Sequence, residues 1–161
     1  MLRELVACAS DGEVPAALRP QVLEVVDRLA EIIRDEQKAA GSDGPGRELA
    51  VVVVDSRTRP RMVRQLGHAA AARLGARALG VVGLSGQEPP QHDVGSAFRL
   101  AQVARSLTLQ GWSAQALDEL RERTVVLVDD WSDSGWTLTT AAFLLREAGA
   151  AAVHPFVLAQ R

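Results

Sequence analysis

Short runs of aliphatic residues alternate along the chain with segments that repeat apolar residues at helical spacing. The runs cover residues 49–54, 78–84, 125–128 and 153–158. The run at 49–54 predicts a strand that is buried on both faces, and the run at 125–128 predicts another buried strand. The runs at 78–84 and 153–158 predict two further apolar strands. Pro155 lies within the last run. Because proline cannot donate a hydrogen bond to a neighbouring strand, this run is predicted to lie at a sheet edge or to contain an irregularity.

The segments between these runs have the pattern of amphipathic helices. Pro20 can occupy the first turn of a helix. The apolar residues after it fall on one predicted buried stripe, formed by Val22, Val25, Val26, Leu29, Ile32 and Ile33. Further helices are predicted over residues 59–74, 96–104, 113–122 and 137–148. Gly75 is placed to end the first of these, and turn-forming residues predict loops over residues 41–46 and 85–95.

This alternation of strands and helices predicts the fold class. We expect a single α/β domain with a mainly parallel, twisted sheet flanked by helices. An N-terminal helical segment, residues 1–40, would pack on a core formed by residues 48–161. Ligands of such sheets bind beyond the carboxyl ends of the strands. The predicted site therefore lies in the loops after Val54, Leu84 and Val128.

Composition and charge narrow the class of protein. The chain has 161 residues, 47% of them hydrophobic and 24% charged, which suits a folded domain and argues against disorder. A net charge of −2 gives no global basic field, so contact with DNA would need a local patch. Cys8 is the only cysteine, no run reaches the ~18 apolar residues of a membrane helix, and residues 1–4 are charged where a signal peptide is apolar. These features predict a cytoplasmic protein without a membrane partner.

The strongest chemical signal follows the third aliphatic run. Asp129 and Asp130 come directly after the run, and residues 133–137 lead into the next predicted helix. The start of a helix offers unpaired N–H groups and the positive end of its dipole, which suit a phosphate. The glycine of this loop lets the backbone approach an anion, and the paired carboxylates can accept hydrogen bonds from a ribose diol. The alternative is that Asp133 or Ser134 only caps the helix.

Residues 125–137 resemble the phosphoribosyl diphosphate signature of type I phosphoribosyltransferases. The resemblance implies that Asp129 and Asp130 hold the ribose hydroxyls. Mg²⁺ would be held by a diphosphate together with these acids, without a dedicated metal site. Asp133 matches the position of an acid that assists the base in some members, which makes it the candidate catalytic residue. The 5′-phosphate would lie in the loop formed by Asp133, Ser134, Gly135, Trp136 and Thr137.

A second loop agrees with this resemblance. Ser56 and Arg57 follow the first aliphatic run, where type I members bind pyrophosphate. Arg57 can pair with a diphosphate through its forked guanidinium. Arg59, Arg61 and Arg64 make the area locally basic, although they can equally lie on the exposed face of a helix.

A narrower resemblance extends over residues 48–160. Segments 56–60, 96–100 and 125–150 are similar to the phosphoribosyltransferase-like domain at the C-terminal end of some bacterial RecQ-family ATP-dependent DNA helicases. This implies an accessory domain that binds a ribose phosphate or nucleotide, with a helicase module in the same or a partner chain. The sequence has no P-loop motif and one lysine, so it does not contain the motor. DNA contact and a homodimer are left open.

The features of a working enzyme are incomplete in this sequence. Residues 85–95 contain no lysine or arginine to cover a diphosphate, and His92 is the one candidate there. Trp131 and Trp136 can stack on a base, restrict the pocket or pack in the core. Three functions therefore remain open: an accessory binding domain, an active Mg²⁺-dependent phosphoribosyltransferase of unknown acceptor, and a protein-interaction domain with a relic site.

Overall fold

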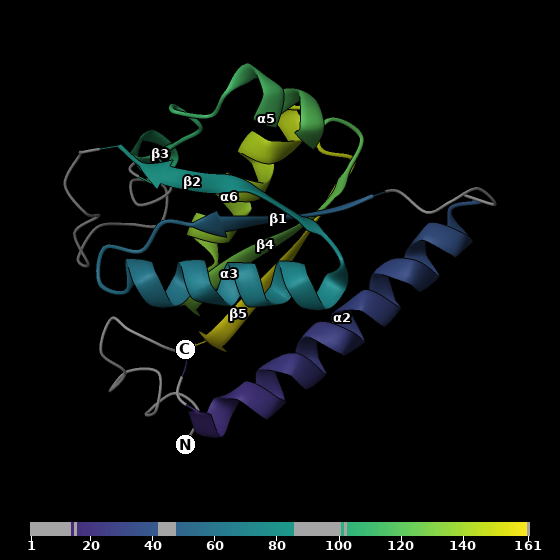
Figure 1. Cartoon of the computed structure of the whole chain (residues 1–161). Helices are drawn as coiled ribbons and strands as arrows, with labels where there is room; N and C mark the ends of the chain where they lie inside the picture. The colour runs from purple at the N-terminus through teal and green to yellow at the C-terminus, as the bar shows by residue number, and fades with distance from the viewer. Residues whose placement is uncertain (1–13, 15, 42–47, 86–100, 102, 161) are drawn as a thin grey trace.

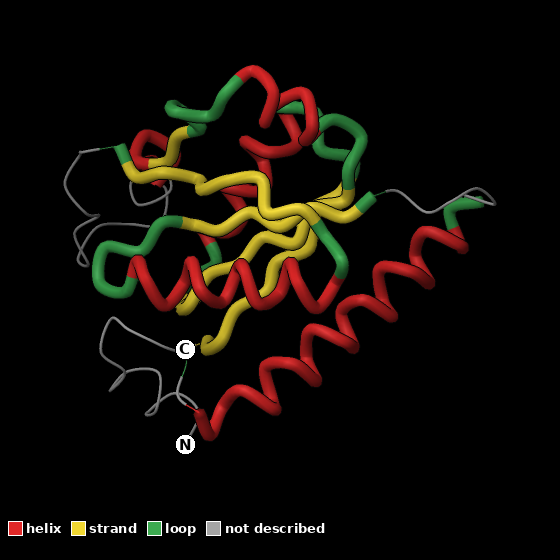
Figure 2. Tube along the Cα trace, in the orientation of Figure 1, coloured by secondary structure: helices red, strands yellow, loops and turns green. Residues whose placement is uncertain are grey.

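The computed structural model describes residues 14, 16–41, 48–85, 101 and 103–160. The strands of this part are β1 (Leu49–Val54), β2 (Arg77–Leu84), β3 (Leu107–Thr108), β4 (Thr124–Ser132) and β5 (Ala152–Gln160). The helices are η1 (Ala16–Leu18), α2 (Arg19–Ala39), α3 (Pro60–Leu74), α5 (Ala114–Leu120) and α6 (Trp136–Glu147). The strands form one sheet in the order β3-β2-β1-β4-β5 (Figures 1 and 2).

Strands β1 and β4 form the centre of the sheet. β1 pairs in parallel with β2 and with β4, β4 pairs in parallel with β5, and β3 pairs antiparallel with the end of β2. Every residue of β1 after the first is buried. Val51 and Val53 belong to the core cluster on one face, whereas Val52 and Val54 belong to the cluster on the other. The prediction of a strand buried on both faces is therefore confirmed for β1 and β4, whereas β2 and β5 are only partly buried. The prediction of a mainly parallel α/β sheet is also confirmed.

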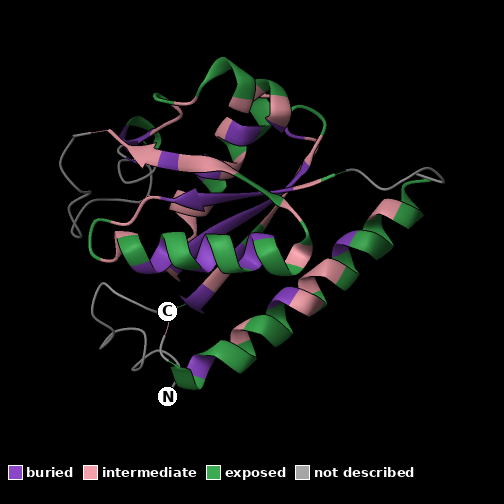
Figure 3. Ribbon diagram, in the orientation of Figure 1, coloured by how far each residue is buried: buried purple, intermediate pink, exposed green. Residues whose placement is uncertain are grey.

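Helices cover both faces of the sheet (Figure 1). On one face α2 and α3 pack against it with Val26, Ile33 and Leu66, among others. On the other face α5 and α6 contribute Leu120 and Leu145. Figure 3 shows the buried positions gathered on the central strands and on the inward sides of the helices. The result is a three-layer arrangement, and ligands of such sheets bind beyond the carboxyl ends of the strands.

Helix α2 packs on the core along a narrower stripe than the sequence predicts. Val26 and Ile33 are each 1% exposed, but Val25 and Ile32 are 49% and 53% exposed. The prediction that these last two residues share the buried stripe is wrong. Successive residues of a helix turn by about 100°, so the two residues lie beside the contact with α3 and the sheet rather than beneath it.

Two strands differ from their predicted extent. β4 continues to Ser132, beyond the predicted end at residue 128, so that Asp129 and Asp130 lie within the strand rather than in a loop. The extension is stabilised by β5, whose Ala159 and Gln160 pair with the end of β4. Strand β3 was not predicted, because two residues carry no periodicity. Most of the helix predicted over residues 96–104 lies outside the described residues, although residues 101 and 103–106 are helical.

The predicted turn and edge signals agree with the structure. Gly75 follows α3 with φ 61°, a left-handed conformation that glycine adopts without steric cost. Pro155 lies on β5, which is the last strand of the sheet order. In the described part of the chain, no helix has the length and apolar character needed to cross a membrane.

Candidate functional site

The central strands bring the two predicted loops to the same edge of the sheet. Val53 of β1 pairs in parallel with Val128 of β4, so the end of β1 lies beside the part of β4 that carries the acid pair. Asp129 and Asp130 follow at once and are 6% and 5% exposed. The acid pair is therefore more deeply buried than a pair of loop carboxylates would be, because β4 continues through it.

Arg59 connects the loop after β1 to this acid pair. Its Nη1 atom donates to Oδ2 of Asp130 at 2.7 Å, and the two side chains are 17% and 7% exposed. Its backbone N–H donates to Oγ of Ser56 at 3.1 Å. The sequence left open that Arg59 lies on the exposed face of a helix. The structure excludes this position, because the side chain of Arg59 is largely buried against Asp130. Arg64, by contrast, is 56% exposed and pairs with Asp55 at 3.3 Å.

Asp129 holds its proton unusually tightly. Burial of the carboxyl, and then the negative charge of adjacent Asp130, raise the pKa of Asp129 to about 8. The backbone N–H of Asp130 donates to Oδ1 of Asp129 at 2.8 Å, which offsets part of this effect. At neutral pH Asp129 is therefore largely protonated, while the side chain of Asp130 accepts a hydrogen bond from Arg59. Such a pair can both donate to and accept from the hydroxyls of a sugar.

The loop between β4 and α6 has the backbone of an anion site. Gly135 is the N-cap of α6 with φ 75°, and a glycine has no side chain to cap the first N–H groups. These groups point out of the helix start together with the positive end of its dipole. Asp133 and Ser134 are exposed, and Thr137 is half-buried in the first turn. The structure thus places all the predicted phosphate-loop residues around one helix N-terminus, next to the acid pair.

The predicted diphosphate residues lie in the neighbouring loop. Arg57 is exposed there, while Ser56 is half-buried and accepts the hydrogen bond from the backbone of Arg59. The contact of Arg59 with the acid pair was not predicted from the sequence. The position of Arg59 in the sequence could have indicated this contact. An arginine just after a predicted diphosphate loop can reach the end of the neighbouring strand, which here carries Asp130.

The acid pair does not fit a direct magnesium site. Mg²⁺ prefers ionised oxygen ligands, but Asp130 is paired with Arg59 and the pKa of Asp129 is raised to about 8. Among the described residues, no group of three or more acidic, histidine or cysteine side chains could hold a metal ion. These residues therefore supply no metal cage of their own, and the expectation that the two acids help to hold Mg²⁺ gains no support.

The tryptophans near the site are packing residues at least in part. Trp131 and Trp136 are half-buried and lie against the core clusters on opposite faces of the sheet. Trp112 donates from Nε1 to the backbone oxygen of Val81 at 2.7 Å. Its ring lies so close to Gly80 that a Cβ there would be 2.9 Å from Cε2. Trp112 therefore packs against β2.

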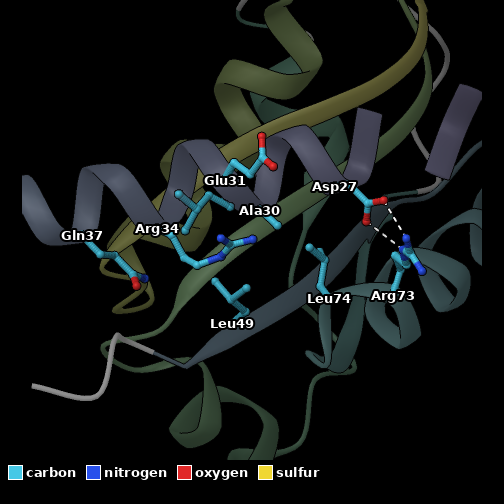
Figure 4. A pocket seen from close by; sticks show the side chains of 9 residues that line it. Asp27, Ala30, Glu31, Arg34, Gln37, Leu49, Arg73 and Leu74 are labelled. Carbon is cyan, nitrogen blue, oxygen red and sulfur yellow. Dashed lines mark hydrogen bonds and ion pairs between the residues drawn. The ribbon is translucent and has the colours of Figure 1, made fainter. Parts of the chain in front are cut away.

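A separate cavity of about 550 Å³ lies between α2, α3 and the start of β1 (Figure 4). Arg34 and Gln37 line it from α2, and Leu74 lines it from α3. At one end Arg73 holds Asp27 through two hydrogen bonds of 2.7 Å, and the pKa of Asp27 is lowered by that hydrogen bonding. This ion pair connects α2 to α3 at the surface. None of the predicted site residues lines this cavity.

Comparison with known proteins agrees with this architecture. Two Trypanosoma cruzi hypoxanthine phosphoribosyl transferase structures, one of them in complex with the product IMP, share 17% and 16% identity with this chain at a TM-score of 0.54. They cover 89% of this chain, which spans 65% and 66% of theirs. The structure of an HPRT variant with glutamic acid at an invariant aspartic acid shares 15% identity with this chain at a TM-score of 0.55. The match covers 89% of this chain and 67% of the HPRT chain. At such identities the likeness shows the fold alone.

The family assignment comes from the sequence comparison. No curated protein matches the chain. The family model described as the phosphoribosyl transferase domain matches residues 18–161, which include α2 as well as the sheet and both loops of the site. This match covers far more than half of the chain and agrees with the shared fold. The chain therefore belongs to the phosphoribosyl transferase domain family.

Proposed function

We propose that this chain binds a ligand with a ribose 5-phosphate group, of the phosphoribosyl diphosphate type, and that it acts as an accessory domain related to those of RecQ-family DNA helicases. The observation that carries the binding proposal is the glycine-capped start of α6 beside the acid pair of β4. A helix start without a capping side chain offers N–H groups and a positive dipole to a phosphate. Donors and acceptors for a ribose lie next to it at Asp129 and Asp130.

Each part of the ligand has a proposed partner. The 5-phosphate would accept from the first N–H groups of α6 and from the hydroxyls of Ser134 and Thr137. The ribose hydroxyls would bond to the acid pair. A diphosphate on the anomeric carbon would lie at the adjacent loop, against Ser56 and Arg57. Mg²⁺ would be held by the diphosphate of the ligand.

Calorimetric titration with phosphoribosyl diphosphate tests the binding proposal. Wild-type protein should bind the ligand. Thr137→Ala should weaken binding about tenfold through loss of a hydrogen bond to a charged group. Asp130→Asn should weaken it further, because the amide cannot replace the carboxylate. Asp118→Asn, at an exposed carboxylate of α5, is the matched control and should bind as wild type does. Absence of binding at millimolar ligand refutes the proposal and leaves a protein-interaction domain with a relic site.

The helicase relation is supported by the resemblance of residues 48–160, and it has a test of its own. The proposal expects the reading frame of this chain, or an adjacent one, to encode a RecQ-family helicase. It also expects that helicase to co-purify with this domain when the two are produced together. Genes without any neighbouring helicase, together with failure to co-purify, would contradict it. DNA contact and a homodimer belong to the same proposal. An electrophoretic mobility shift with DNA would test the first, and the molecular mass of the protein in solution would test the second.

An active phosphoribosyltransferase is the second candidate, favoured by the family match and by the enzymes that share the fold. Asp133 would then be the candidate catalytic residue at the phosphate loop. The sequence of residues 85–95 weighs against it, because this stretch contains no lysine or arginine to cover a diphosphate. Release of pyrophosphate, measured with a panel of nucleobases and Mg²⁺, separates the two candidates. If no base gives release above that of Asp130→Asn, the enzyme candidate is refuted.

A further inference from the structure

The ion pair between Arg59 and Asp130 joins the two loops that a phosphoribosyl ligand would bridge. Arg59 is the N-cap of α3 and is separated from the proposed diphosphate residues Ser56 and Arg57 only by Thr58. Its Nη1–Oδ2 distance to Asp130 is 2.7 Å, and both side chains are largely buried. Its backbone N–H is fixed at Ser56 by a hydrogen bond of 3.1 Å. An exposed ion pair would be weak and mobile, whereas the Arg59–Asp130 ion pair is largely buried. This ion pair, the bridge, therefore holds the two loops in one arrangement in the unliganded site.

The bridge competes with ribose binding. Asp130 is 5% exposed, so little of its carboxylate remains open to a second set of hydrogen bonds while the guanidinium lies against it. A ribose diol that reaches this carboxylate must displace Arg59. The displaced guanidinium then needs a new partner, because a largely buried charge without one is costly.

The chemistry of the ligand decides whether such a partner exists. Ribose 5-phosphate carries one anionic group, and that group lies at the helix start of α6 in the proposed pose. Phosphoribosyl diphosphate carries a second anionic group at the other end of the sugar, on the side of the loop that holds Arg59. Guanidinium pairs readily with such a group through forked hydrogen bonds.

We infer that Arg59 is a specificity-determining residue that makes the site select ribose 5-phosphate ligands with a second anionic group on the anomeric carbon. The inference rests on the proposed function of the site. The diphosphate takes the guanidinium from Asp130, and the freed carboxylate accepts hydrogen bonds from the ribose hydroxyls. Binding of the diphosphate and binding of the ribose are thereby coupled. Each of the two raises the affinity of the site for the other by the same factor.

The wild-type protein gives the first test, which needs no variant. Ribose 5-phosphate is titrated calorimetrically in the absence and in the presence of saturating pyrophosphate. Pyrophosphate should draw Arg59 away and tighten the binding of ribose 5-phosphate by about tenfold, if the bridge occupies about nine tenths of the unliganded molecules. Unchanged or weaker binding of ribose 5-phosphate in the presence of pyrophosphate overturns the inference.

Variants of two arginines on α3 and its N-cap give the second test. Arg59→Gln removes the bridge, whereas Arg64→Gln removes the same charge at a 56% exposed position that pairs with Asp55. The ratio of affinities for phosphoribosyl diphosphate and ribose 5-phosphate should fall about tenfold in Arg59→Gln and stay at the wild-type value in Arg64→Gln. Circular dichroism confirms that each variant is folded, and Arg59→Lys, which keeps the charge, should retain most of the wild-type ratio.

The outcomes separate this inference from the proposed function. If wild-type protein binds neither ligand, the proposed function fails and the inference fails with it. If wild-type protein binds both, and Arg59→Gln has the same affinity ratio as Arg64→Gln, only the inference fails.

Discussion

Replacing Asp129 with asparagine is expected to flatten the pH dependence of the protein's stability. The pKa of this carboxyl is raised from 3.8 to about 8 in the folded chain, chiefly by burial and by the charge of Asp130. The unfolded chain loses the proton near its ordinary pKa, whereas the folded chain keeps it up to the raised value. The contribution to stability is therefore complete at acid pH and is lost as the pH rises through the folded pKa.

The size of the effect follows from proton linkage. Between the two pKa values the folded state binds one proton more than the unfolded chain. The free energy of unfolding then falls by at most about 1.4 kcal/mol per pH unit, or about 3 kcal/mol from pH 5 to pH 7. This is a large part of the ~5–15 kcal/mol by which domains are stable, so ordinary urea unfolding can resolve it.

The assay is urea unfolding of wild type and of Asp129→Asn at intervals of one pH unit from pH 5 to pH 8. The amide cannot ionise, so the variant should lose the downward slope that Asp129 contributes. Asp118→Asn, at a side chain that is 85% exposed, should keep the wild-type slope. If the wild type and Asp129→Asn give parallel curves, the raised pKa and the burial argument behind it are wrong.

Three further predictions, which use four substitutions, concern the packing of side chains. Gly67→Ala would place a Cβ 2.3 Å from Cγ1 of Val53, and should cost about 1–3 kcal/mol of unfolding free energy; an unchanged urea midpoint would contradict this contact. Leu145 of α6 is fully buried, so Leu145→Ala should cost about 2–5 kcal/mol of unfolding free energy. Phe143 on the same helix is 61% exposed, so Phe143→Ala should change the unfolding free energy by less than about 0.5 kcal/mol. Equal losses in the two variants would refute the assigned buried face of α6. Trp112→Phe should cost about 1 kcal/mol, because it removes the Nε1 hydrogen bond to the backbone of β2, and near-ultraviolet circular dichroism would report whether the ring still packs.

The sequence by itself determined most of the elements and the position of the candidate site. Continuous aliphatic runs predicted β1 and the start of β4, because a strand buried on both faces has no polar positions. The glycine-containing loop after β4 predicted an anion site at the start of α6, because a helix start presents its N–H groups whatever lies around it. These predictions depend on neighbouring residues in the chain, which is why periodicity and spacing sufficed.

The details that decide the state of the site came only from the tertiary structure. The strand at Asp129 and Asp130 extends because β5 lies beside it, and the raised pKa of Asp129 depends on how completely the layers bury that carboxyl. Arg59 and Asp130 are 71 residues apart in the chain and meet because β1 and β4 are neighbours in the sheet. Burial and contacts between distant segments are set by packing, and no local pattern in the sequence specifies which charges will meet.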